Sequence, residues 1–301
     1  MAFVLDLIRV GRGDRDLLDT LISVAIVQAN VAPLLRDADL QKAYAADDEA
    51  PPDELRRPVS MNAIAHSLVL PYETVRRRVT AMTADGICEM IPGGVIISSQ
   101  VLSSPGHRQV IIDTYDLVRR FYLRLRQLGE LAGLPEPVRP WDPAADTPVR
   151  MVVRCSSDYV LRLVDLLTRH IGDLIAGVVF LDILRANTER LPDSERGGPD
   201  AGPSGFVHDA HRQPVRVATL AGRLDIPQET VRRHAAQLLK DDRCERVDGG
   251  LIIPSRVLAR PNVVQMMRDN HASLYRLYAH LAQLGIGAEW ERQAAQTAAT
   301  R

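Results

Sequence analysis

An internal repeat constrains the fold of this chain more than any other feature of its sequence. Residues 58–129 align without a gap with residues 214–285, and 29 of these 72 aligned pairs are identical. Upstream, Asp16–Asn30 matches Asp173–Asn187 at an offset of 157 instead of 156. Self-similarity at a nearly fixed offset indicates that one structural unit occurs twice. The sequence therefore predicts two related halves, residues 1–145 and 146–301, joined through a proline-rich linker between Pro135 and Pro148.

Each half is predicted to contain two short helices and a β-hairpin. In the first half, Ser60 can cap a helix over Met61–Leu68, and Pro71 can open a second helix over about Tyr72–Thr83. Two β-prone runs, Cys88–Ile91 and Val95–Ser98, follow around a Pro-Gly-Gly turn. The second half repeats these elements over residues 217–224 and 228–239 and around 249–250. This order is typical of a helix-turn-helix with a wing, so the predicted fold is mainly α with two winged units in tandem.

A long helix is expected after each hairpin, over about Pro105–Leu131 and Pro261–Leu284. Its heptad-like apolar positions can complete the core of each half, or form an interface between halves or between chains. Roughly 40 Å of helix exceeds what one winged unit can cover, so both interpretations are expected to hold in part. The two halves are predicted to form a pseudo-two-fold pair, and a homodimer through the long helices stays open.

The second short helix of each half contains the same five residues, ETVRR, at 73–77 and 229–233. With Val75 and Val79 facing inward at about 100° per residue, Glu73, Arg77 and Thr80 point outward. Arginine can bind guanine O6 and N7, and glutamate can accept a hydrogen bond from cytosine N4. A helix salt bridge between the Glu and the Arg four residues later is the alternative explanation. Because both copies keep ETVRR where the surrounding surface has diverged, DNA contact is favoured.

The segments PYETVRRRVTAMTADG and PQETVRRHAAQLLKDD resemble the recognition helix of bacterial winged-helix regulators, most closely those of the Crp/Fnr type. The order of helices around the hairpin is also similar to that of MarR-type regulators. In the Crp/Fnr type, a Glu and an Arg four residues later read base edges, which implies this role for the matching pairs here. The sequence contains no counterpart of the cyclic-nucleotide-binding β-roll, so that effector is not implied. The residues predicted to contact DNA are Tyr72, Glu73, Arg76, Arg77, Thr80, Gln228, Glu229, Arg232, Arg233 and Gln237.

The expected function is sequence-specific binding of double-stranded DNA for transcriptional control, with no effector identified. The formal net charge of −1, from 37 basic and 38 acidic residues, gives no general sign of a nucleic-acid partner. It keeps open a tandem winged-helix scaffold that binds other proteins, and a plasmid-type replication initiator is a second alternative. A continuous basic surface over both recognition helices would favour DNA, and a neutral apolar one would favour protein.

No catalytic, metal or cofactor site is expected. No CxxC pair occurs among the three cysteines, and Cys88 and Cys244 are predicted to be buried small residues, with a redox switch as the minor alternative. His208, Asp209 and His211 resemble metal ligands, but no further ligand lies near them in the sequence, so a solvated loop is favoured. The glycine pairs in the two hairpins are turn residues, because no GK[ST] follows. The chain is therefore not expected to be an enzyme.

The remaining expectations concern surfaces and location. The loop before each repeated block is predicted to lie at the surface and to differ between the halves. One loop is acidic, with Asp47, Asp48, Glu49, Asp53 and Glu54, and the other contains Gly197, Gly198, Pro199, Gly202, Pro203 and Gly205. Arg78 and its counterpart His234 are expected either to contact phosphate or to be solvated. The N-terminus is too short and too charged for a signal peptide, and charges within residues 160–184 argue against a membrane span, so a cytoplasmic location is expected.

Overall fold

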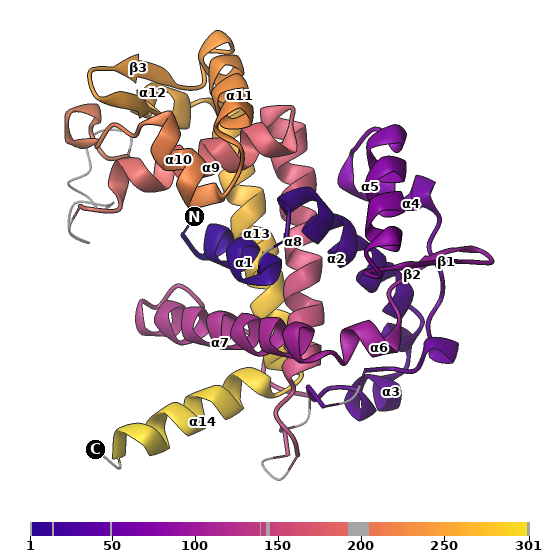
Figure 1. The fold of residues 1–301 in the computed structure, drawn as a ribbon. Coiled ribbons are helices and arrows are strands. Elements are labelled where there is room, and N and C mark those ends of the chain that lie inside the picture. Colours follow the sequence, from indigo (N-terminus) through magenta and orange to yellow (C-terminus); the bar gives the residue numbers. More distant parts are fainter. Residues whose placement is uncertain are drawn as a thin grey trace. The chain divides into compact units, whose positions relative to one another are not determined.

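The protein is described here by a computed structural model, which covers residues 2–13, 15–48, 50–138, 140–142, 145–191 and 205–299. These residues are mainly helical, with fourteen α-helices and two small two-stranded sheets, which confirms the predicted mainly α class (Figure 1). Several residues of the expected surface loops and linker lie outside the described part of the chain, namely Glu49, Pro143, Gly197, Gly198, Pro199, Gly202 and Pro203.

The chain forms two compact units that do not coincide with the two sequence halves. The α5 unit comprises Asp6–Leu163 and Ala272–Arg301, and the α11 unit comprises Met1–Leu5 and Val164–His271. The expected boundary near residue 145 differs from this division because a helix that starts just after the linker, α8 (Val149–Ile171), contributes its first part to the α5 unit. The backbone N–H of Arg150 there donates to the carbonyl of Ala45 at 2.8 Å.

Matching helices of the two repeats have the same lengths. α2 (Leu17–Val31) and α9 (Leu174–Thr188) have 15 residues each, and α4 (Met61–Leu68) and α10 (Val217–Leu224) have eight. The pairs that follow are α5 (Tyr72–Ala84) and α11 (Gln228–Lys240), α6 (Ser99–Leu102) and α12 (Ser255–Leu258), and α7 (Pro105–Gln127) and α13 (Pro261–Gln283). The other helices are α1 (Ala2–Arg12), α3 (Ala38–Ala43) and α14 (Ile286–Ala299).

The turn between α4 and α5 follows from local chemistry. Ser60 accepts a hydrogen bond from the N–H of Ala63 and so caps α4, as expected. Val69 ends α4 in the left-handed region at φ 53°, and Asp225 does the same after α10 at φ 49°. The core-facing residues of the first helix pair are buried as predicted, namely Ile64, Ala65, Leu68, Val75, Val79 and Met82.

Each hairpin is antiparallel and pairs with one further residue upstream. β1 (Glu89–Ile91) pairs with β2 (Gly94–Ile96), and β3 (Glu245–Val247) pairs with β4 (Gly250–Ile252). Val59 and Val215 form the matching bridges to β2 and β4. A Cβ at Gly94, whose φ is 143°, would lie 2.3 Å from the carbonyl oxygen of Val59, and Gly250 repeats this at 2.4 Å from Val215. Both glycines are therefore required where the third segment crosses the hairpin.

A buried asparagine joins the upstream helix to the hairpin in both repeats. The Asn30 amide donates to the carbonyls of Arg57 and Val95 at 2.8 and 3.1 Å, and it accepts from the N–H of Ile97. Asn187 makes the same three bonds to Gln213, Leu251 and Ile253. Because both side chains are fully buried, these bonds give partners to amide groups that would otherwise be buried without any. The predicted match between α2 and α9 thus corresponds to one repeated hydrogen-bond network.

The two loops before the repeated blocks end in the same structure, which corrects the expectation that they differ throughout. Asp53 pairs with buried Arg56 and accepts from the N–H of Ser99 at 2.8 Å. In the second repeat, Asp209 pairs with buried Arg212 at 3.1 Å and accepts from the N–H of Ser255 at 2.6 Å. These aspartates begin short 3₁₀ turns, Asp53–Leu55 and Asp209–His211. Asp209 is therefore a structural residue, and no cluster of three metal-binding side chains occurs in the described ranges.

Within the α5 unit, aromatic side chains of the second half cover the apolar face of α7. Tyr122 lies with its ring centroid 5.4 Å from that of Tyr278 and 5.3 Å from that of Trp290. The indole Nε1 of Trp290 donates to the hydroxyl of Tyr115 at 2.7 Å, and the Tyr278 hydroxyl donates to the carbonyl of Val118. One side of a long helix therefore serves as an interface between sequence halves, as expected in part.

Candidate nucleic-acid interface

The outer face of α5 presents the residues predicted to contact DNA. Tyr72, Glu73, Arg76, Arg77 and Thr80 are all exposed. The apolar side chains of α5 face inward and hold this helix against α2 and α4. The predicted outward phase of the charged residues is therefore confirmed for this helix.

The ion pair on α5 differs from the one considered in the sequence analysis. Glu73 pairs with Arg76 at i+3, with 2.9 Å between Nε and Oε2, and this hydrogen bond raises the pKa of Arg76. No hydrogen bond or ion pair of the Arg77 guanidinium is found among the described residues. The ion pair at i+4 considered above is therefore not formed in α5.

Helix α11 repeats this arrangement. Its predicted contact residues are all exposed, namely Gln228, Glu229, Arg232, Arg233 and Gln237. Glu229 pairs with Arg232 at 2.6 Å, again at i+3, and this hydrogen bond lowers the pKa of Glu229. The guanidinium of Arg233 makes neither a hydrogen bond nor an ion pair within the described ranges. The amide of Gln237 donates to Asp241 at 2.9 Å, so it is partly occupied within the helix.

Arg78 and His234 are not simply solvated, because each contacts the aspartate cap of the preceding helix. Arg78 donates to the carboxylates of Asp16 and Asp19, each at 2.7 Å, and Asp16 is the N-cap of α2. In the second repeat, Nδ1 of His234 lies 3.1 Å from Asp173, the N-cap of α9. Hydrogen bonding with His234 lowers the pKa of Asp173. These side chains tie the recognition-type helix to the preceding helix, and the matching Asp residues in the sequence repeat were the signal for this contact.

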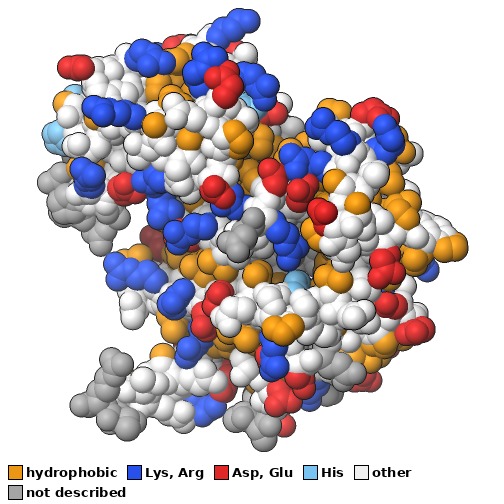
Figure 2. Space-filling model, viewed as in Figure 1, with side chains coloured by type: hydrophobic (Ala, Val, Ile, Leu, Met, Phe, Trp, Pro, Cys, Tyr) orange, Lys and Arg blue, Asp and Glu red, His pale blue; other side chains and the backbone are white. Residues whose placement is uncertain are grey.

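The hairpins add a residue that the sequence analysis did not single out. Arg246 is exposed on β3, the strand that follows α11 in the chain. The matching position on β1 is Met90, which is 51% exposed. On the face shown in Figure 2, Lys and Arg side chains gather over α5 and over α11, each time with Asp or Glu side chains among them. Each candidate surface is thus basic but not continuously so.

The cysteines at the base of the hairpins are buried, as predicted. Cys88 and Cys244 are 1% and 2% exposed. Burial raises the pKa of both thiols, to about 12 for Cys244. A thiol that stays protonated at neutral pH is a poor nucleophile and a poor redox sensor, which agrees with a packing role.

In comparisons with known proteins, neither a protein-family model, nor a curated protein, nor a solved structure matches this chain. No helix in the described part of the chain is both long enough and apolar enough to cross a membrane. The functional assignment therefore depends on the residues and contacts described above.

Proposed function

We propose that this protein is a sequence-specific DNA-binding transcriptional regulator built from two tandem winged helix-turn-helix units. In this proposal α5 and α11 are the recognition helices, and double-stranded DNA is the partner. The observation that carries the proposal is that the side chains of Arg77 and Arg233 are exposed and unbonded among the described residues. Both are exposed on the outer face of the second helix of a helix pair, and neither guanidinium forms a hydrogen bond or an ion pair among the described residues.

An exposed arginine near the start of such a helix suits the major groove. Residues in the first turns of a recognition helix reach base edges, and a free guanidinium can donate two hydrogen bonds to guanine. Glu73 and Glu229 already hold Arg76 and Arg232, so these two ion pairs would help to orient the contact surface. Arg246 on β3 would contact phosphate, as the wing of such a unit commonly lies beside the backbone.

The repeat itself is the basis for a further part of this proposal. Both helices carry ETVRR, and the exposed residues around this motif differ between them. The chain would then act as a single-chain pseudo-dimer whose two recognition helices read similar half-sites.

Selection of binding sites from random double-stranded DNA tests this proposal. A DNA-binding regulator should enrich a composite site of two related half-sites, and its binding should weaken as salt increases because phosphate contacts release counterions. The acidic side chains among the basic ones in Figure 2 favour a second candidate, a scaffold that binds other proteins. Failure to enrich any sequence would refute the regulator and leave the scaffold as the candidate to pursue.

A further inference from the structure

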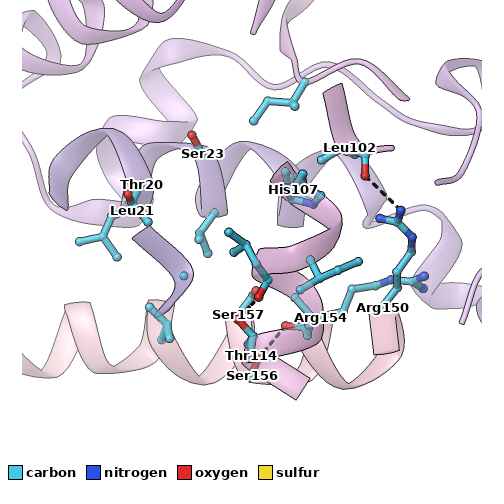
Figure 3. A pocket seen from close by; sticks show the side chains of 18 of the residues that line it. Thr20, Leu21, Ser23, Leu102, His107, Thr114, Arg150, Arg154, Ser156 and Ser157 are labelled. Carbon is cyan, nitrogen blue, oxygen red and sulfur yellow. Dashed lines mark hydrogen bonds between the residues drawn. The ribbon is translucent and has the colours of Figure 1, made fainter. Parts of the chain in front are cut away.

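A cavity lies inside the α5 unit, away from the outer face of α5. Its walls come from α1, α2, α7, the first part of α8 and the segment after β2, and its volume is about 140 Å³. Most of the wall is aliphatic, with Val24 and Val27 from α2, Val110 and Ile111 from α7, and Val153 from α8. Figure 3 shows His107, Arg150 and Arg154 together at one end of the cavity, and Thr20, Leu21 and Ser23 at the other.

The basic end of the cavity contains a buried guanidinium that lacks a full set of partners. Arg154 is 8% exposed, its Nη2 donates to the carbonyl of Tyr44, and its Nη1 is buried without an acceptor among the described residues. No carboxylate in the described part of the chain forms an ion pair with it. Burial lowers the pKa of Arg154 to about 10, and the charge of Arg150 adds to this effect, so the group stays charged at neutral pH.

The neighbours of Arg154 do not neutralise its charge. Arg150 is 6% exposed and donates to the backbone carbonyls of Leu102 and Asp47 at 3.0 and 3.1 Å. Burial lowers the pKa of Arg150, and the carboxylate of Asp47, which opposes this shift, is itself paired with Arg108 at 2.6 Å. Burial lowers the pKa of His107 to about 4, helped by the charges of Arg150 and Arg15, so this imidazole is neutral. An unpaired buried cation with an unmet donor is costly, and a bound anion would relieve both costs.

The second repeat has larger buried side chains at the matching positions of its upstream helix. Ser23, Val24 and Val27 of α2 correspond to Phe180, Leu181 and Leu184 of α9, and these larger side chains are 0%, 6% and 5% exposed. His107 corresponds to Val263, which is also buried. The matching helices of the second repeat therefore form with larger side chains at the positions that line the cavity in the first. In the first repeat, small side chains on α2 keep the space open and polar groups line it.

We propose that this cavity binds a small aliphatic monocarboxylate. A cavity of about this size with aliphatic walls accepts a body close to benzene in volume, that is roughly six carbon atoms. The carboxylate accepts hydrogen bonds from Nη1 of Arg154, and the hydrocarbon chain lies against the valines of α2 and α8. The proposal does not depend on DNA binding, because Arg154 and the cavity walls lie outside the outer face of α5.

Titration calorimetry of the full chain with hexanoate, hexanamide and hexylamine at neutral pH tests the site. Hexanoate should bind at least about tenfold more tightly than hexanamide, because a hydrogen-bonded charge is worth more than a neutral partner, and hexylamine should not bind. Equal binding of hexanoate and hexanamide, or binding of none of the three, would overturn the proposal.

Two variants locate the ligand. Arg154→Gln should weaken hexanoate binding at least about tenfold, while Arg162→Gln, an exposed arginine on the same helix, should leave it unchanged. Because Arg154 also holds the Tyr44 carbonyl, its removal could unfold the protein. Ser23→Phe, which introduces the residue of the second repeat, keeps Arg154 and should abolish binding by filling the cavity. Undiminished hexanoate binding in a folded Ser23→Phe protein would place the ligand elsewhere and refute the site.

Discussion

Helices α2 and α9 occupy matching positions in the two repeats. The contacts at their ends are the same, but the side chains between these ends differ in size. Both begin at an aspartate cap and end in a fully buried asparagine that holds the hairpin. Between these ends, α2 has Ser23 and Val27 on the cavity wall, whereas α9 has the larger, buried Phe180 and Leu184 at the matching positions. The two repeats thus share the aspartate and asparagine contacts at the ends of α2 and α9, and they differ in the buried side chains between these ends.

A buried ion pair shows the same divergence. Asp182 on α9 is 2% exposed and pairs with Arg223 at 3.0 Å, whereas the first repeat has Ala25 and Ser67 at these positions. Burial raises the pKa of Asp182 although Arg223 opposes this shift. Arg223 also binds Glu189 at 2.7 Å, so it reaches from the core to the surface. The second repeat therefore contains a buried ion pair, whereas the first repeat forms the matching helices without one.

Removal of either buried asparagine should have the largest effect on stability. Asn30→Ala and Asn187→Ala each remove three hydrogen bonds and leave the N–H of Ile97 or Ile253 without its acceptor, which should cost about 3 kcal/mol. The carbonyls of Val95 and Leu251 keep their bonds from the N–H groups of Val59 and Val215. Urea unfolding should show similar losses for the two variants, and Asn62→Ala on the exposed side of α4 should show little change. A loss in one repeat without a comparable loss in the other would break the equivalence of the two frames.

The buried ion pair should give the next largest effect. Asp182→Ala leaves the Arg223 guanidinium partly buried without this partner, and the expected loss is about 2 kcal/mol, less than for a fully buried pair because Arg223 keeps Glu189. Asp182→Ala combined with Arg223→Ser reproduces the residues of the first repeat. Thermal unfolding of the double variant should recover part of the loss. If the double variant is no more stable than Asp182→Ala, the loss does not come from leaving Arg223 without its partner, and the account of this ion pair is wrong.

The cap contact should give the smallest effect and a distinct pH dependence. The pKa of Asp173 lies below its usual 3.8, so its contribution to stability is present above that pH and is lost as the pH falls below it. Asp173→Asn keeps a good N-cap residue but weakens the pairing with His234, which should cost less than about 1 kcal/mol because the site is half exposed. Unfolding curves of variant and wild type should converge on acidification. A difference that grows at low pH would contradict this role.

The repeat made much of the frame predictable. The Ser60 cap of α4, the buried faces of the helix pairs and the glycines of both hairpins follow from local rules, and ETVRR indicated the outer face of α5. The loops hid the Asp53 and Asp209 contacts, because only four of the residues from 53 to 59 are kept at 209–215. Helix α8 escaped prediction because it follows a linker, and its N-terminal part has no counterpart in the repeat that would have marked it.

The cavity could not be read from the sequence for a different reason. Its lining comes from five helices and the segments between them, so Ser23 on α2 is recognisable as a cavity residue only once His107 and Arg154 lie near it. Comparison of the repeats does show that Ser23 stands where the second repeat has Phe180. Periodicity alone cannot tell whether a small buried residue is tightly packed or borders an empty space.

The central claim is that Arg77 and Arg233 read DNA from equivalent positions, and fluorescence anisotropy tests it most directly. Binding of the selected site and of random DNA should be compared for the wild type, Arg77→Ala, Arg233→Ala and the control Arg162→Ala. Loss of one guanine contact should weaken binding of the selected site about 5- to 150-fold, with much less effect on random DNA. The control should match the wild type. If both variants bind the selected site as tightly as the wild type, α5 and α11 are not recognition helices and the account is wrong.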